Sequence, residues 1–211
     1  MKYSILRNRW LDPSLLRLLE GQTTARRCAS LCLRLSDCVA FVVDRENSLC
    51  YGTSFIPTQE TAMTSTGDTG FYVMLCRLPD RCRLENGYIY HVTTDTCFQL
   101  HTKYSVKYVR ADGECAEVGE QMLKLDTEVK DEMIRTFLQA VGKIVDLHIQ
   151  GTRVESHWFY DSGDKFKFFN WASQSNDNQQ HHIIMSYSDG WLWRGVSQLQ
   201  AAGFICELKP L

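Results

Sequence analysis

Nine cysteines are the residues whose type and spacing indicate chemistry most clearly in this chain. They are spread along the sequence at Cys28, Cys32, Cys38, Cys50, Cys76, Cys82, Cys97, Cys115 and Cys206. A reducing cytosol would keep such thiols reduced, whereas secreted and extracellular domains use them as disulfide cross-links. The pattern therefore predicts two disulfide-stapled modules in an oxidising compartment, and it favours recognition over catalysis.

The first four cysteines need a helix and two strands to bring them together. Thr23 or Thr24 can cap a helix that carries the first two cysteines one turn apart on one face. The β-branched and aromatic run 38–43 predicts a strand, and a second short strand follows over 49–55. We expect a helix stapled onto a hairpin, although four cysteines allow three pairings and their spacing does not choose among them.

The rest of the chain predicts a hairpin, two helices and a half rich in aromatic strands. The hairpin covers 87–100, and helical periodicity covers 104–118 and 127–140. The second helix is expected to bury Val129, Met133, Ile134, Phe137 and Leu138. Its outward residues are expected to be Glu128, Lys130, Asp131, Glu132 and Arg135. Two helices followed by strands and loops indicate an α+β domain.

Length, charge and hydropathy limit the partner classes. A length of 211 residues suits one or two domains, and 44% hydrophobic content is enough for packed cores. The net charge of -2 gives no reason to expect nucleic acid or an anionic membrane as partner. No run approaches the ~20 apolar residues of a membrane-spanning helix. The first ten residues do not resemble a signal peptide, so we expect the natural N-terminus or the signal to be missing here.

The first module carries a spaced set of cysteines with small and aromatic residues beside them: Cys28, Ala29, Cys32, Cys38, Ala40, Phe41 and Cys50. Over roughly residues 3–76 this pattern resembles a PAN/apple domain, and an unrelated small cysteine-rich domain is the alternative. The resemblance implies the disulfides Cys28–Cys50 and Cys32–Cys38. Cys76 stands where many members place one end of a further bridge, but no cysteine precedes Cys28. Cys76 is therefore expected to be unpaired here, or to bond to another chain or to an upstream cysteine.

The second module carries an ordered series of motifs: the spacing Tyr108, Ala111, Cys115, the strand 145–151, the aromatic segments 158–163 and 170–171, and the ending 203–207. Over residues 82–208 this order resembles the long form of the C-type lectin-like domain. The resemblance implies the disulfides Cys82–Cys97 and Cys115–Cys206. It also places the second internal bridge of the family at His182 and Val196, so that bridge is expected to be absent.

The calcium site of the sugar-binding members is changed more strongly. The resemblance places its ligands at Gln174-Ser175-Asn176, Gln180 and Trp191-Leu192-Trp193. Calcium takes about six to eight oxygen ligands, several of them anionic, and no carboxylate stands at these positions. We therefore expect the calcium site to be lost and the chain to need no cofactor.

The polar segment 174–181 is the best candidate for a recognition loop, because its amides can hydrogen-bond to hydroxyl or backbone groups beside aromatic side chains. An ordinary solvated loop is the alternative. The candidate ligand-binding residues are Gln174, Asn176, Asp177, Asn178, His181, Trp193 and Arg194. Strand alternation would place Trp193 on the same face as Trp191, which conflicts with an exposed Trp193 unless the strand bulges.

The histidines of this half have simpler explanations than metal binding. Adjacent residues on a strand point to opposite faces, so one of His181 and His182 should pack inside and the other should face solvent. We do not expect a zinc site there. His148, on an apolar strand, is expected to be a hydrogen-bonded core residue.

The sequence thus predicts an α+β chain of two stapled modules: a PAN/apple-like domain over 1–76, a short linker over 77–81 and a long-form C-type lectin-like domain over 82–211. The resemblance implies a secreted, extracellular, non-enzymatic protein of cell adhesion or innate immunity. Its expected partner is a glycan or an extracellular protein, bound without calcium. One alternative is a calcium-dependent lectin with a remodelled site. Another is a matrix or mucus component that forms disulfide-linked oligomers through Cys76.

Overall fold

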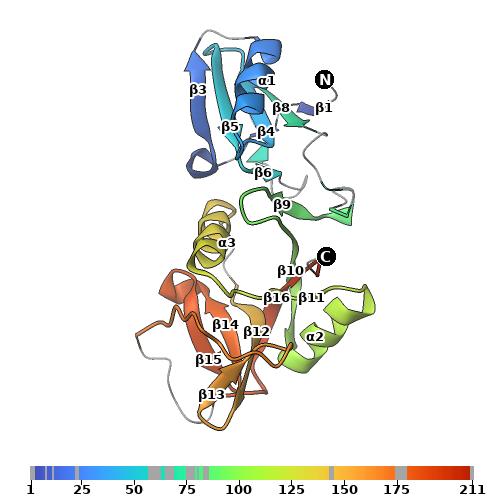
Figure 1. Cartoon of the computed structure of the whole chain (residues 1–211), viewed down its shortest axis with the longest axis vertical. Coiled ribbons are helices and arrows are strands. Elements are labelled where there is room, and N and C mark those ends of the chain that lie inside the picture. Colours follow the sequence, from blue (N-terminus) through green and yellow to red (C-terminus); the bar gives the residue numbers. More distant parts are fainter. Residues whose placement is uncertain are drawn as a thin grey trace. The chain divides into compact units, whose positions relative to one another are not determined.

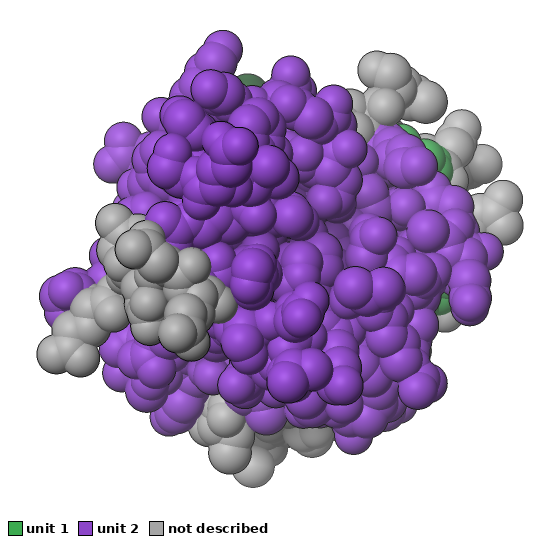
Figure 2. Space-filling view, turned by 90° about the horizontal axis from the view of Figure 1, so that it is seen from below, with its two compact units in different colours: residues 1–97 green, residues 98–211 purple. Residues whose placement is uncertain are grey.

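A computed structural model describes most of the chain and arranges it in two units, residues 1–97 and 98–211 (Figures 1 and 2). The described residues are 3–7, 9–10, 12–21, 24–56, 63–64, 69–74, 79, 81–82, 86–142, 145–173 and 180–209. Cys76 and most of the predicted linker lie outside them. No helix among the described residues is long and apolar enough to cross a membrane.

The first unit is built on an antiparallel sheet with the strand order β1-β8-β4-β5-β3. These strands are β1 (Tyr3–Arg7), β3 (Arg17–Gly21), β4 (Ala40–Asp44), β5 (Leu49–Thr53) and β8 (Thr69–Met74). β2 (Arg9–Trp10) pairs separately with β7 (Met63–Thr64). A 3-10 turn at Pro13–Leu15 precedes β3. The run 38–43 thus forms a strand as expected, beginning at Ala40.

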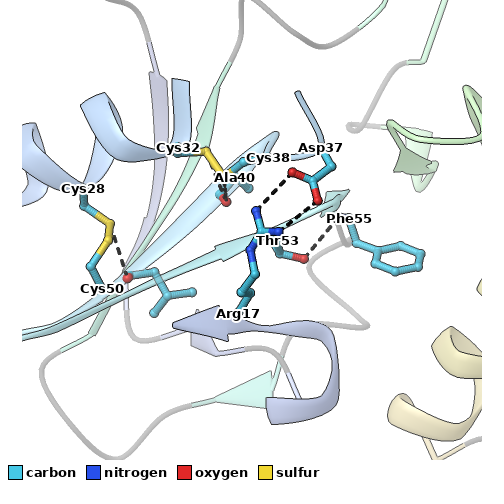
Figure 3. The surroundings of a disulfide bond; sticks show 10 residues. Arg17, Cys28, Cys32, Asp37, Cys38, Ala40, Cys50, Thr53 and Phe55 are labelled. Atoms are coloured by element: carbon cyan, nitrogen blue, oxygen red, sulfur yellow. Dashed lines mark hydrogen bonds and ion pairs between the residues drawn. A yellow bond between two sulfur atoms is a disulfide. The ribbon is translucent and has the colours of Figure 1, made fainter. Parts of the chain in front are cut away.

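Helix α1 (Ala25–Arg34) is fixed to this sheet by two disulfides, Cys28–Cys50 and Cys32–Cys38 (Figure 3). Thr24 caps the helix, with its hydroxyl accepting from the amide of Arg27 at 3.3 Å. The two bonds join the cysteines that the PAN/apple resemblance implies. They lie in a buried cluster with Phe41 and other side chains of the sheet, so helix and sheet share one core.

The predicted hairpin belongs to the first unit up to Cys97. Its first strand, β9 (Ile89–His91), pairs with β6 (Phe55–Ile56), the short strand that follows β5 in the chain. The Phe55 and His91 rings lie 4.5 Å apart between centroids. The disulfide Cys82–Cys97 closes the hairpin, as the resemblance implies.

The second unit has a sheet with the strand order β15-β14-β12-β16-β10. Its strands are β10 (Thr96–Lys107), which starts in the first unit, β11 (Gln121–Met122), β12 (Leu147–Val154), β13 (His157–Phe159), β14 (His182–Ser186), β15 (Leu192–Val196) and β16 (Ala201–Glu207). The sheet pairs are antiparallel except β12 with β16. Figure 1 shows helices α2 (Tyr108–Glu117) and α3 (Glu128–Ala140) on opposite sides of β16.

The disulfide Cys115–Cys206 joins α2 to β16 and pairs the cysteines that the lectin resemblance implies. It lies in a buried cluster with Tyr108, Met122 and Phe204. The predicted first helix was too long, because residues up to Lys107 remain in β10 and pair with β16 as far as Ala201.

The second helix has the expected length, with Thr127 as its cap, but its buried face is rotated from the predicted one. Met133, Ile134, Phe137 and Leu138 are buried as expected. Val129 is 59% exposed, whereas Asp131 is only 1% exposed. The prediction of a buried Val129 and an outward Asp131 is therefore wrong. Asp131 shares its face with Ile134 and Leu138, at spacings of three and seven residues.

Candidate ligand-binding site

The segment predicted to bind ligand is held at both ends by β15. Gln174, Asn176, Asp177 and Asn178 lie outside the described residues, which end at Ser173 and resume at Gln180. Before the gap, the amide of Trp193 donates to the carbonyl of Asn170, and the amide of Ala172 donates to the carbonyl of Trp193, both at 2.8 Å.

After the gap, the amide of His181 donates to the carbonyl of Val196 at 2.8 Å. The carbonyl of His181 accepts from the amide of Arg153 on β12 at 2.9 Å. Gln180 packs over Gly195, where an added Cβ would lie 2.0 Å from its Oε1 atom. The described residues on both sides of 174–179 are therefore hydrogen-bonded to or packed against one strand, β15, and these contacts are called the base below.

Asp131 is the polar centre of this base. Its carboxylate accepts from Nε1 of Trp193 at 2.6 Å and from Nδ2 of Asn170 at 2.5 Å. Burial raises the pKa of this carboxyl, although both hydrogen bonds act in the opposite direction. Asp131 thus connects α3 to both β15 and the start of the candidate segment. A carboxylate on an otherwise apolar helix face was the sequence signal for this role, and we had placed it outward.

Trp193 is not part of the binding surface. Its side chain is fully buried, and its ring contacts Phe166, Phe168 and Trp171 edge to face. The prediction that Trp193 binds ligand is therefore wrong. Its burial agrees with the strand alternation, which argued against an exposed Trp193. Its indole serves the fold, because its N–H satisfies the buried carboxylate of Asp131.

His181 is exposed and Arg194 is partly exposed, so both can contact a ligand. The Arg194 guanidinium lies 2.5 Å from Oδ2 of Asp189, and this ion pair holds it beside the turn before β15. His182 is buried and stacks on Tyr108 with 3.8 Å between ring centroids. Burial lowers the pKa of His182 to about 4. The prediction of one inward and one outward histidine is confirmed.

His148 is fully buried, with Nε2 at 3.2 Å from the carbonyl oxygen of Val106, so its prediction as a hydrogen-bonded core residue is confirmed. Burial also lowers its pKa. His182 and Val196, which correspond to the absent family disulfide, stand directly opposite each other on β14 and β15.

Aromatic side chains extend from the base toward solvent. The Trp171 ring stacks on Phe169 at 5.9 Å between centroids and leans on Trp158 at 5.3 Å. The Arg153 guanidinium carbon lies 6.0 Å from the Trp158 ring centroid. Phe169 is 44% exposed. The sequence analysis did not single out Phe169 or Arg153, because their ring and cation contacts join segments that are distant in sequence.

The positions that correspond to calcium ligands supply few oxygens among the described residues. Trp191 and Trp193 are buried, and Leu192 between them is apolar. Gln180 directs its amide at Gly195. Among the residues that the structure describes, no three His, Cys, Asp or Glu side chains converge as metal ligands would.

About half of this chain is similar to C-type lectin domains. The C-type mannose receptor 2 of Homo sapiens is 24% identical over 122 residues, which are 56% of this chain and 8% of the receptor. The Mus musculus receptor of the same name is 22% identical over 121 residues, with the same shares. The chain thus spans less than a tenth of these relatives. No family model matches.

Two solved structures show a partial likeness to the chain. The C-type lectin domain of murine dendritic cell inhibitory receptor 2, in complex with N-glycan, has a TM-score of 0.49 and 12% identity, covering 55% of this chain and 91% of that one. Human lithostathine has a TM-score of 0.49 and 17% identity, covering 55% and 84%. Both TM-scores are below 0.5. The fold is therefore defined by the disulfides and strand order of the chain itself.

Proposed function

We propose that this chain is an extracellular recognition protein whose second module binds a carbohydrate or protein ligand without calcium. The observation that carries the proposal is the base around β15. It holds both ends of the polar segment 174–181 by backbone hydrogen bonds. In this proposal the amides of the segment and the exposed His181 contact the ligand.

The loss of calcium is part of the same proposal. The strand that would supply a carboxylate has Trp191, Leu192 and Trp193 instead, and the two tryptophans are buried in the core. A calcium-dependent lectin would need another set of anionic oxygens. The proposal therefore assigns ligand contacts to hydrogen bonds and aromatic surface, with no metal.

The wider assignment is proposed on the same basis. We infer a PAN/apple-like domain over 1–76, a linker over 77–81 and a lectin-like domain over 82–211. The protein would be secreted and have no enzymatic activity. The four disulfides support an oxidising compartment, because such cross-links form and persist there and are rare in a reducing cytosol. They use eight of the nine cysteines, and the remaining Cys76 is the reason to keep a cross-linked matrix component as the second candidate.

The test is a glycan and extracellular-protein array probed with the full chain, with calcium and again with EDTA. We expect the same ligands in both conditions. Asp177→Ala and His181→Ala should each weaken binding about tenfold, which corresponds to ~1.4 kcal/mol. Glu117→Ala removes a carboxylate from α2 and should leave binding unchanged.

Signals that vanish in EDTA would overturn calcium independence. Signals indifferent to both His181→Ala and Asp177→Ala would remove the segment from the site. A non-reducing gel of the same sample distinguishes the second candidate, which predicts oligomers that Cys76→Ser converts to monomers.

A further inference from the structure

The outer face of the β12–β13 hairpin combines cations with apolar side chains. In the register of the hairpin Val154 stands opposite His157, and a further bridge places Lys165 opposite Phe159. Side chains two residues apart on a strand share a face. The resulting outer hairpin face consists of Val154, His157, Phe159, Lys165 and Lys167. In Figure 1 this hairpin lies at the lower end of the second unit, the end from which Figure 2 is viewed.

Ring and cation contacts support this grouping. Nζ of Lys165 lies 5.8 Å from the Phe159 ring centroid, and the His157 ring lies 6.4 Å from the same ring. Phe159 is half-buried, whereas His157, Lys165 and Lys167 are exposed. Val154 is 55% exposed. The Phe159 ring thus lies between the His157 imidazole and the Lys165 ammonium group, at the protein surface.

The charge of this face differs from that of the unit around it. Acidic residues outnumber basic ones in residues 98–211, yet this face presents two lysines. Neither lysine forms an ion pair with a described residue. Of the nearby acids, Asp164 pairs with Lys124 at 3.7 Å, and Glu155 occupies the exposed hairpin turn. An anionic partner would therefore meet uncompensated positive charge here.

We propose that the outer hairpin face binds a sulfated polysaccharide. The apolar face of a sugar ring can stack on Phe159, while its sulfates pair with Lys165 and Lys167. The two lysines are about 6.6 Å apart along an extended segment, so they can meet successive charges of one polymer. Arg153 and Trp158, which contact His181 and Trp171, stand on the opposite side of the hairpin from this face. The inference thus goes beyond the function proposed above.

The experiment uses heparin as the probe and the full chain on a heparin column, eluted with a salt gradient. K165Q/K167Q should elute at clearly lower salt than wild type, with affinity reduced about tenfold, since both of the lysines proposed to pair with sulfates are neutralised. K103Q/K107Q removes the same charge from exposed positions of β10 and should elute like wild type. Phe159→Leu keeps the charge and an apolar side chain but loses the ring, and should elute between wild type and K165Q/K167Q.

Other outcomes would overturn the proposal. Equal losses of heparin affinity in K165Q/K167Q and K103Q/K107Q would show that only the total charge of the protein matters. Equal retention on desulfated heparin would remove the role of sulfate, and passage of wild type through the column would remove the site. Binding to phosphatidylserine vesicles without binding to heparin would indicate a membrane surface instead. Unchanged thermal unfolding of the variants excludes misfolding as the cause of a loss.

Discussion

At the scale of single residues, a few buried polar groups organise the second unit. Asp131 accepts hydrogen bonds from the side chains of Trp193 and Asn170, which lie on different segments. A buried carboxylate is costly unless its oxygens are hydrogen-bonded, and both are satisfied here. Sequence periodicity placed Asp131 outward because a charged residue on a helix usually faces solvent. Only the tertiary partners Trp193 and Asn170 explain its burial.

Asp131→Asn tests this arrangement. The substitution keeps the shape of the side chain but turns one acceptor into a donor, so one of the two N–H groups loses its partner. We expect the free energy of unfolding to fall by about 1–3 kcal/mol, measured by urea denaturation. Glu132→Gln makes the same chemical change at an exposed position of α3 and should alter stability by less than ~0.5 kcal/mol. Similar values for the two variants would contradict the buried role of Asp131.

Buried histidines predict acid sensitivity. Burial lowers the pKa of His91 in the first unit and of His182 in the second to about 4. In the unfolded chain these groups titrate near pH 6.5, so the unfolded state binds more protons between about pH 6.5 and 4. Stability is therefore full above about pH 6.5 and is lost as the pH falls toward 4.

Urea denaturation followed by tryptophan fluorescence at pH 7.5 and 5.0 measures this loss. Every tryptophan except Trp10 lies in the second unit, so the signal reports mainly on His182 and its surroundings. We expect a decrease on the order of 2 kcal/mol for wild type, and a smaller decrease for His182→Gln. An identical pH dependence in the two proteins would show that His182 is not the titrating group.

At the scale of elements, features that depend on neighbouring residues were predicted well. Strand pairing between distant parts of the chain was not. Thr24, one of the two predicted caps, does cap α1, because a cap depends on residues three positions apart. Thr127 caps α3 in the same way, although its cap had not been predicted. The start of α2 was predicted too early, because residues 104–107 are periodic enough for a helix but belong to β10, where Val106 and Lys107 pair with β16. Likewise, the apolar pattern of α3 predicts most of its buried face, but the burial of Asp131 depends on its hydrogen bond to Trp193 on β15.

The β14–β15 hairpin offers a test of strand register. His182→Cys with Val196→Cys should form a disulfide, because the two residues are direct cross-strand partners. Closing a loop of this length should raise the free energy of unfolding by about 3 kcal/mol in the chain-entropy model. Losing the stacking of His182 on Tyr108 reduces this gain. Intact mass after thiol blocking, without reductant, detects the bond. The matched pair Ile184→Cys with Val196→Cys is out of register, and a bond there but not at 182–196 would contradict the pairing.

At the scale of the whole molecule, two stapled α+β modules could be predicted because cysteine spacing constrains the chain over long distances. The unit boundary after Cys97 could not, since it depends on the pairing of β6 with β9, two strands of only two and three residues. The candidate site was found in sequence only as a polar segment. Its base of Asp131, Asn170 and β15 depends on contacts between distant parts of the chain.

Calcium titration of the full chain by isothermal calorimetry tests most directly whether recognition here is independent of metal. We predict no heat of binding at sub-millimolar calcium, because no three carboxylate or other metal-binding side chains converge among the described residues. A sub-millimolar site that Asn176→Ala abolishes would contradict the account, since it would place a working calcium site in the segment that we propose binds ligand without one.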